Sequence, residues 1–338
     1  MKKTILPAYY KILSLEFPAF LTPYLQLPLL KRLEGIGLLC GTDWTRLYHN
    51  RFFYSRFDHS VGVALIIWNF TKDKKQTIAG LLHDISTPVF SHVMDFRHND
   101  ALHQEYTEQD NARMIAEDKE LLQLLKNDQL DMEEVIDYQE YPIADNSLPQ
   151  LSADRLEYMF MTGLIMEDIW TLEDIAEAYG NMEVMRNESG LPEIGFTDER
   201  IAREYCLKCC KTGMIMIKNE NKLALSLLAH LSEWALRLGA VRESDFYTKS
   251  EQEILNLFSS IQDTHFRRYF MTFREMAAIV RSEHEVADSF CIRVDVKRRY
   301  INPLCNGVRI SDLSDEAAQT IRSLKEFTDS TFAAVGIC

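Results

Sequence analysis

The chain has 338 residues, of which 46% are apolar and 26% charged. This composition is typical of folded globular proteins and excludes collagen-like, disordered and disulfide-scaffold chains. The length predicts about two domains, or one large domain with an appended lobe. A formal net charge of −14 disfavours a protein that binds nucleic acid by nonspecific neutralisation of phosphates, so we expect no stable nucleic-acid partner.

The chain shows no sign of export or membrane insertion. It reaches Lys11 before any apolar segment of signal-peptide length, and its seven cysteines are an odd number spread over a long sequence. The apolar run from Val61 to Trp68 is far shorter than the roughly 20 residues that cross a bilayer. We therefore expect a cytoplasmic protein with reduced thiols.

The first half of the sequence has mostly helical periodicity, from Leu25 to about Ala178. The apolar spacing predicts helices over residues 60–70, 76–85, 111–125 and 153–166. Ser55 and Asp58 are spaced as a capping box at the start of the first of these helices, and Ser152 is expected to cap the last. His59 would then lie in a first helical turn.

The residue pattern of the second half of the sequence predicts a hairpin and further helices. Residues 182–196 contain a turn-like NESG between two short extended segments, and Thr197 and Asp198 can cap a helix that begins near Glu199. Helical patterns return over residues 223–238 and 249–259.

A strand is predicted over residues 290–301, followed by a turn at Asn306-Gly307. The fold class is therefore mainly α, with a C-terminal helical lobe that carries a small β-sheet or hairpin. We predict two units, residues 1–180 and 181–338, packed against each other because no Gly/Ser linker separates them.

Histidines are concentrated in one part of the chain. Five of the nine lie between positions 59 and 103: His59, His83, His92, His98 and His103. One or two buried structural histidines would be ordinary, but five by chance is a poor explanation. Imidazole together with carboxylate suits a divalent transition metal, so the cluster predicts a metal site.

His83 and Asp84 are adjacent, so they can reach one metal only from a helix end or bend. The sequence supplies that end, because an apolar helical stretch precedes the pair and Pro88 stops it shortly afterwards. Alone, the dipeptide would more often be a chance pair. His59 and Asp154, each near a predicted helix start, would complete four ligands.

Three segments together resemble the HD-domain phosphohydrolases. They are RFDHSVGVA (56–64), LLHDISTPVFSHVMD (81–95) and ADRLEY (153–158). Their order and approximate spacing are most similar to the deoxynucleoside triphosphate triphosphohydrolase branch, and RYINPL (299–304) is similar to a late strand of those proteins. The resemblance implies an HD-type helical core within residues 1–180.

The resemblance also implies roles for individual residues. His59, His83, Asp84 and Asp154 would bind one divalent ion (Mn, Fe, Mg, Ni, Co or Zn) and leave two octahedral positions open. Such an ion would polarise a phosphoryl group and lower the pKa of a bound water. Members of the branch assemble as homo-oligomers, which is the state that the resemblance implies here.

Residues that contact the substrate are implied in the same way. Arg56 matches an arginine that contacts phosphate, a role that suits a planar guanidinium. Arg155 and Tyr158 match positions near phosphate and sugar. A solvated arginine and an ordinary core tyrosine are the alternatives for Arg56 and Tyr158.

His92, Asp95 and His103 match a group that would transfer a proton to the leaving oxygen. The first two are three residues apart and so share a helix face. Taken alone, His103 would be read as a surface histidine.

The chain departs from the branch at several positions, among them Pro88 and Val89, which stand in place of a Gly-Pro pair. Thr87 stands where a histidine is common, Leu38 replaces a glutamine that helps to recognise the sugar, and Gln104 replaces a glutamate. Three functions remain open: a nucleoside triphosphate triphosphohydrolase, a phosphohydrolase of another ester such as a nucleoside monophosphate, and a nucleotide-binding regulator with little turnover.

Overall fold

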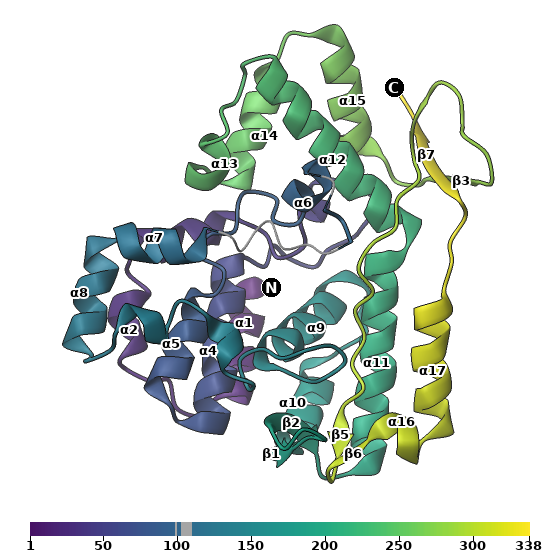
Figure 1. The fold of residues 1–338 in the computed structure, drawn as a ribbon. Helices are drawn as coiled ribbons and strands as arrows, with labels where there is room; N and C mark the ends of the chain where they lie inside the picture. Colours follow the sequence, from purple (N-terminus) through teal and green to yellow (C-terminus); the bar gives the residue numbers. More distant parts are fainter. Residues whose placement is uncertain (99, 103–109) are drawn as a thin grey trace.

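The computed structural model describes residues 1–98, 100–102 and 110–338. The described chain is mainly helical, with two small sheets (Figure 1). The helices of the first half are α1 (Lys2–Leu13), α2 (Leu21–Tyr24), α3 (Pro28–Lys31), α4 (Arg56–Thr71), α5 (Lys74–Leu82), α6 (Val93–Arg97), α7 (Asn111–Glu117), α8 (Lys119–Asn127), α9 (Ala153–Met166) and α10 (Leu172–Gly180). Short 3₁₀ helices lie at Arg32–Gly35, Thr42–Trp44, Met132–Glu134 and Tyr138–Glu140.

Helices α4 and α5 form the centre of the first half. Ser55 and Asp58 make the predicted capping box, in which the Ser55 side chain accepts from the backbone N–H of Asp58 and the Asp58 carboxylate accepts from that of Ser55. The two helices approach closely at Gly80, where an added Cβ would come within 2.2 Å of Ile67. This contact fixes the C-terminal end of α5, from which His83 and Asp84 follow.

The remaining helices are α11 (Glu199–Ile217), α12 (Asn219–Arg237), α13 (Asp245–Thr248), α14 (Glu251–Ser260), α15 (Thr264–Glu275), α16 (Ile310–Leu313) and α17 (Asp315–Glu326). Asp198 caps α11 through the backbone N–H of Ile201, as the sequence predicts. Figure 1 shows α11 beside α9 and α10, with α12 to α15 gathered at the top of the view and the C-terminus close to them.

The sheets lie outside the helical centre. β1 (Met182–Arg186) and β2 (Pro192–Phe196) form the predicted antiparallel hairpin, with Val184 opposite Ile194. β5 (Leu304–Cys305) pairs parallel with β2 and antiparallel with β6 (Val308–Arg309), which gives the order β1-β2-β5-β6. The second sheet has the order β3-β7-β4 and contains β3 (Val280–Ser282), β4 (Ser289–Ile292) and β7 (Phe332–Gly336).

Two predicted elements are wrong. Residues 111–125 do not form one helix, because Asp118 leaves the helical conformation after α7 and caps α8 through the N–H of Leu121. Residues 290–301 are a strand only as far as Ile292. Residues 293–303 continue without a strand partner, and Val296 and Ile301 are buried against the helices instead.

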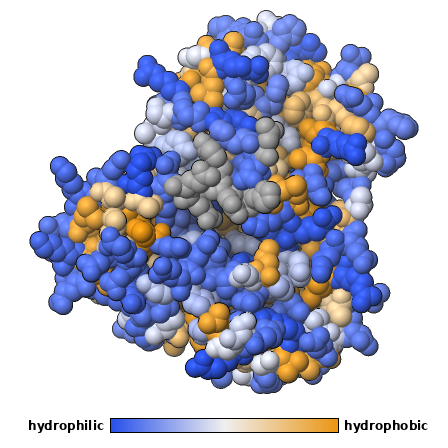
Figure 2. All heavy atoms as spheres, viewed as in Figure 1, coloured by the Kyte–Doolittle hydropathy of each residue, from blue (hydrophilic) through white to orange (hydrophobic). Residues whose placement is uncertain are grey.

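The surface of the described residues is mostly polar. The face in Figure 2 is largely hydrophilic, and its apolar side chains gather in separate patches, one of them near α7 and α8. Among the residues that the structure describes, no helix combines the length and the apolar character needed to cross a bilayer.

Candidate active site

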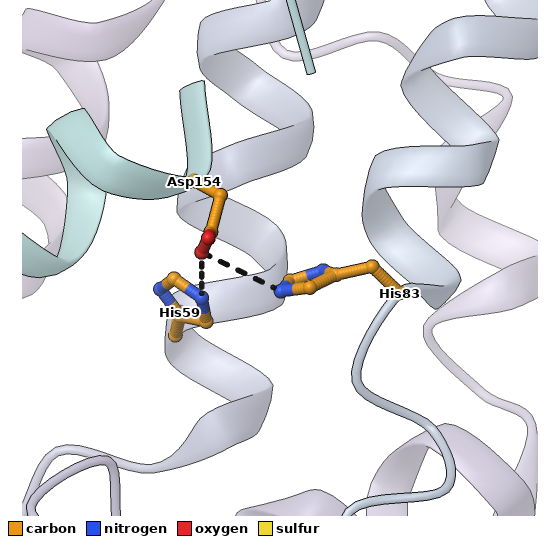
Figure 3. A group of neighbouring side chains, drawn as sticks. All are labelled: His59, His83 and Asp154. Carbon is orange, nitrogen blue, oxygen red and sulfur yellow. Dashed lines mark ion pairs between the residues drawn. The ribbon is translucent and has the colours of Figure 1, made fainter. Parts of the chain in front are cut away.

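Three of the predicted metal ligands meet between α4, the end of α5 and the start of α9 (Figure 3). The Oδ1 atom of Asp154 lies 3.0 Å from Nε2 of His59 and 3.7 Å from Nε2 of His83. One ligand atom from each of the three residues lies within 4.8 Å of the other two. Both imidazoles are buried, and the Asp154 side chain is 20% exposed.

Asp84, the fourth predicted ligand, lies against the same two imidazoles. Its Oδ2 atom is 3.5 Å from Nε2 of His83 and 3.8 Å from Nε2 of His59. Arg56 donates to both carboxylate oxygens of Asp84, at 3.1 and 2.8 Å, and Thr87 donates its hydroxyl to Oδ1 at 2.9 Å. The structure therefore brings all four predicted ligands together.

A hydrogen bond at Nδ1 fixes the orientation of each imidazole. His59 Nδ1 lies 2.5 Å from Oε2 of Glu157, and His83 Nδ1 lies 2.7 Å from the carbonyl oxygen of Gly80. An acceptor at Nδ1 places the proton there and leaves Nε2 as the ligand atom, an arrangement typical of metal-binding histidines. Both Nε2 atoms accordingly face Asp154.

The Asp154 carboxyl is held in its ionised form. Burial raises the pKa of Asp154, but the hydrogen bond and charge of His59 outweigh burial and lower the pKa to about 2. Burial likewise raises the pKa of Asp84, and the charges of Arg56, His83 and His59 bring it well below its ordinary value. Two ionised carboxylates therefore border the two imidazoles.

The charge balance of this cluster fits a cation. Burial lowers the pKa of His59, but Glu157 and Asp154 outweigh burial and raise the pKa to about 10. A proton on His59 thus compensates the surrounding carboxylates, and a divalent cation among the same nitrogen and oxygen atoms would replace that proton. The donor set, two imidazoles and carboxylates, is one that Zn, Fe, Mn, Co and Ni accept.

His92 and Asp95 also lie together, at the start of α6. Nδ1 of His92 is 2.7 Å from Oδ2 of Asp95, which is fully buried, and the His92 side chain is 22% exposed. Burial lowers the pKa of His92, while Asp95 opposes that effect. His103, the third member of the predicted proton-transfer group, lies outside the described residues.

The two arginines expected to contact phosphate are engaged with the protein. Besides Asp84, Arg56 donates from Nε to Ser91. Arg155 pairs with Asp145 at 3.0 Å, donates from Nε to the Gln150 carbonyl and from Nη2 to Asn146. In the structure Arg56 holds Asp84, and Arg155 holds the loop before α9.

A cavity of about 260 Å³ opens beside the cluster. It is lined by His59, His83, Asp84 and Asp154, and also by His92, Tyr158 and both arginines. Leu38 lies in its wall, whereas the buried Thr87 faces Asp84. Residues of the C-terminal half complete the lining: Ile215, Met216, Asn221, Leu225, Val296, Lys297 and Arg299.

One supporting residue of the cluster was missed at the sequence level. Glu157 is fully buried and accepts the hydroxyls of Tyr54 at 2.5 Å and Tyr9 at 3.2 Å as well as the His59 ring. Gly62 makes room for it, because an added Cβ would lie 2.7 Å from Oε1 of Glu157. The sequence offered one sign of this role, because Glu157 follows the predicted ligand Asp154 by one helical turn.

Comparisons with known proteins find a domain match that covers most of this cluster. Residues 56–147 match the model of the HD domain, a segment that contains every residue of the cluster except those of α9. The chain is 26% identical over 241 residues to the uncharacterized protein YdhJ of Bacillus subtilis, a match that covers 67% of each protein. It is 30% identical over 104 residues to the metal-dependent phosphohydrolase cns2 of Cordyceps militaris, covering 31% of this chain and 30% of the relative.

Solved structures show the same fold over almost the whole chain. A phosphohydrolase from Bacteroides thetaiotaomicron superposes with a TM-score of 0.61 at 15% identity, covering 96% of this chain and 97% of the other. A hypothetical protein from Aquifex aeolicus gives a TM-score of 0.59 at 16% identity, covering 95% and 93%.

Residues 56–147 thus match the HD domain, and the described chain has a mainly α fold. Together the HD-domain match and the relative cns2 support a metal-dependent phosphohydrolase, with the substrate left open.

Proposed function

We propose that the protein hydrolyses a phosphate monoester of a small organic molecule, with a nucleoside monophosphate as the best representative. The single observation that carries this choice is that Arg56 and Arg155 are each paired with a carboxylate, Asp84 and Asp145. These two guanidinium charges are largely compensated before any substrate arrives.

Charge arithmetic supports a substrate of low charge. Among the described residues, four basic and three acidic side chains line the cavity, a formal charge of +1. A divalent cation would raise this to about +3, which is enough to neutralise the roughly −1.5 to −2 charge of a phosphate monoester completely. A triphosphate would bring about twice that negative charge.

The cavity also suits a compact ligand with an apolar body. Its volume of about 260 Å³ is near the lower end for small-molecule sites, which span roughly 300–1,000 Å³. Tyr138, Tyr158 and Phe96 lie in its wall together with aliphatic side chains. Such a lining would accept a planar base or another ring beside the metal cluster.

His59, His83, Asp84 and Asp154 would hold the divalent ion. When bound, that ion would withdraw charge from a phosphate oxygen and lower the pKa of a coordinated water. Arg56 and Thr87 keep Asp84 in place, and Glu157 and the Gly80 carbonyl keep the two imidazoles in place.

We assign proton transfer to His92. With Nδ1 hydrogen-bonded to Asp95, its Nε2 atom is available to hold a proton for the leaving oxygen, and the Asp95 carboxylate would stabilise the imidazolium. The ring borders the same cavity as the metal cluster. His103 would assist, as the sequence resemblance implies.

The order and spacing of the motifs at 56–64, 81–95 and 153–158 favour a second candidate. This is hydrolysis of a deoxynucleoside triphosphate to nucleoside and triphosphate. The products distinguish the two. Purified protein is incubated with Mn²⁺, Co²⁺, Ni²⁺, Zn²⁺ or Mg²⁺ and with nucleoside monophosphates and deoxynucleoside triphosphates. Inorganic phosphate released from the monophosphates supports our proposal, whereas intact triphosphate released from the triphosphates supports the second candidate.

Variants of the cluster control this experiment. His83→Ala and Asp154→Asn should abolish turnover and lower the bound metal, while His265→Ala, an exposed histidine on α15, should change neither. Hydrolysis that persists in both cluster variants would overturn the proposed role of the metal site.

A further inference from the structure

The C-terminal half contributes charged side chains to the cavity. Residues 293–303 run alongside α11 (Figure 1), and from this stretch Val296, Lys297 and Arg299 reach the cavity lining. In the sequence, this segment is far from the HD-domain match at residues 56–147. The cavity is therefore completed by a part of the chain that the HD motifs do not include.

Arg299 differs from the other arginines of the cavity in its partners. Arg56 is paired with Asp84, and Arg155 with Asp145. Within residues 1–98, 100–102 and 110–338, by contrast, the Arg299 guanidinium has no hydrogen bond and no ion pair. A cation at a cavity without a compensating carboxylate is what an anionic ligand requires.

The backbone at Arg299 is firmly positioned. Its carbonyl oxygen packs against Gly213 of α11, where an added Cβ would lie only 2.2 Å away. Two residues further on, the Ile301 carbonyl accepts the thiol of Cys206 at 3.5 Å, and the Asn302 N–H donates to the Pro149 carbonyl at 2.9 Å. These contacts fix the point from which the side chain extends.

The charge of Arg299 acts on residues of the candidate site. Burial lowers the pKa of His92, and Arg299 contributes in the same direction. Burial raises the pKa of Tyr158 to about 12, and Arg299 opposes that rise. Arg299, His92 and Tyr158 line the same cavity.

We propose that Arg299 is a substrate-binding residue that contacts the phosphate oxygens of the anionic substrate. The inference rests on the proposed function, in which a phosphate ester occupies this cavity. A planar guanidinium can donate two parallel hydrogen bonds to one phosphate, which a lysine ammonium cannot reproduce. Arg299 would supply the uncompensated charge that Arg56 and Arg155 do not.

The test measures binding of inorganic phosphate to the metal-loaded protein by isothermal titration calorimetry. Arg299→Ala should weaken phosphate binding about tenfold to a hundredfold, because a hydrogen bond to a charged group is lost. Arg299→Lys should recover only part of that loss. Arg322→Ala removes an exposed arginine of α17 and should bind phosphate as the wild type does.

Turnover of a nucleoside monophosphate separates this inference from the proposed function. A rise in KM for Arg299→Ala larger than any fall in kcat supports a binding role. Undiminished phosphate binding in Arg299→Ala, or no phosphate binding by the wild type, would overturn the role of Arg299 alone. A wild type that binds phosphate through Arg299 but hydrolyses no phosphate ester would overturn the proposed function and leave the anion site in place.

Discussion

Oε2 of Glu157 lies 2.5 Å from Nδ1 of His59, and both side chains are almost completely buried. The contact joins two helices, α4 and α9, behind the metal cluster. Because Asp154 is one turn earlier on α9, the same pair of helices supplies a ligand to the cluster and the carboxylate that orients another ligand. The geometry of the cluster therefore depends on how these helices pack.

Replacing Glu157 should weaken metal binding without removing a ligand. In Glu157→Gln the side chain keeps its size but loses the charge that favours the required His59 tautomer, so metal affinity should fall about 10- to 100-fold. Metal content after dialysis against graded chelator measures this change. Glu173→Gln, an exposed glutamate of α10, is the matched control. Full metal retention by Glu157→Gln would contradict the orienting role.

Removing the guanidinium beside Asp84 should cost stability. Arg56→Met leaves the Asp84 carboxylate buried without its partner, and breaking a buried pair in this way typically costs about 3–5 kcal/mol. A divalent ion should restore part of that loss because it compensates the same carboxylate. Urea denaturation with and without Mn²⁺ tests both effects, and Arg322→Met is the exposed control. Equal losses with and without metal would count against Asp84 as a ligand.

His92 should affect turnover and leave metal binding unchanged. His92→Ala removes the proposed proton donor, a contribution typically worth about 10²–10⁴ in rate. The same loss is expected for His103→Ala, and a smaller one for Asp95→Asn. Steady-state kinetics together with metal analysis distinguish the roles, with His265→Ala as the control. Loss of metal from His92→Ala would show that the assignment is incorrect.

Glu251 should make the stability of the protein depend on pH. This fully buried carboxyl accepts the Gly37 N–H at 3.0 Å and the Trp44 indole N–H at 2.6 Å. Burial raises its pKa from the ordinary 4.5 to about 7; the Trp44 hydrogen bond opposes the rise, and the charge of Asp43 adds to it.

The folded state consequently binds a proton more tightly than the unfolded state does. The contribution of Glu251 to the free energy of unfolding therefore falls as pH rises from about 4.5 to 7, and the cost is complete above that range. Glu251→Gln should reduce the loss between pH 5 and pH 8 by on the order of 2–3 kcal/mol. Urea denaturation at both pH values measures it, with the exposed Glu326→Gln as control. An unchanged pH dependence would refute the prediction.

Gly213 should matter for the position of Arg299. Alanine normally stabilises a helix relative to glycine by up to ~1 kcal/mol, but here its Cβ would lie 2.2 Å from the Arg299 carbonyl oxygen. Gly213→Ala should therefore displace the Arg299 backbone and weaken phosphate binding. Gly180→Ala, at a position with no atom within 4 Å of the added Cβ, should not. Calorimetry measures phosphate binding by both variants. Equal phosphate affinities of the two would argue that the backbone position of Arg299 does not matter for binding.

Much of the local structure followed from the sequence. The capping box at Ser55 and Asp58, the cap at Asp198 and the Asn306-Gly307 turn are encoded by residues a few positions apart, and each is present. The error at residues 290–301 has a different, non-local origin. Apolar alternation over 290–301 predicts a strand, but the partner of such a segment lies elsewhere in the chain, and here buried helices take that place.

The sequence by itself determined the mainly α character, the presence of the helices around the cluster and the candidate ligands His59, His83, Asp84 and Asp154, because short-range spacing and residue chemistry specify them. Only the tertiary structure decided which charges are paired. Arg56 meets Asp84 across 28 positions, Glu157 meets His59 across 98, and Arg299 reaches the cavity from the opposite half of the chain. Such contacts arise from the packing of distant elements, and no local pattern specifies them.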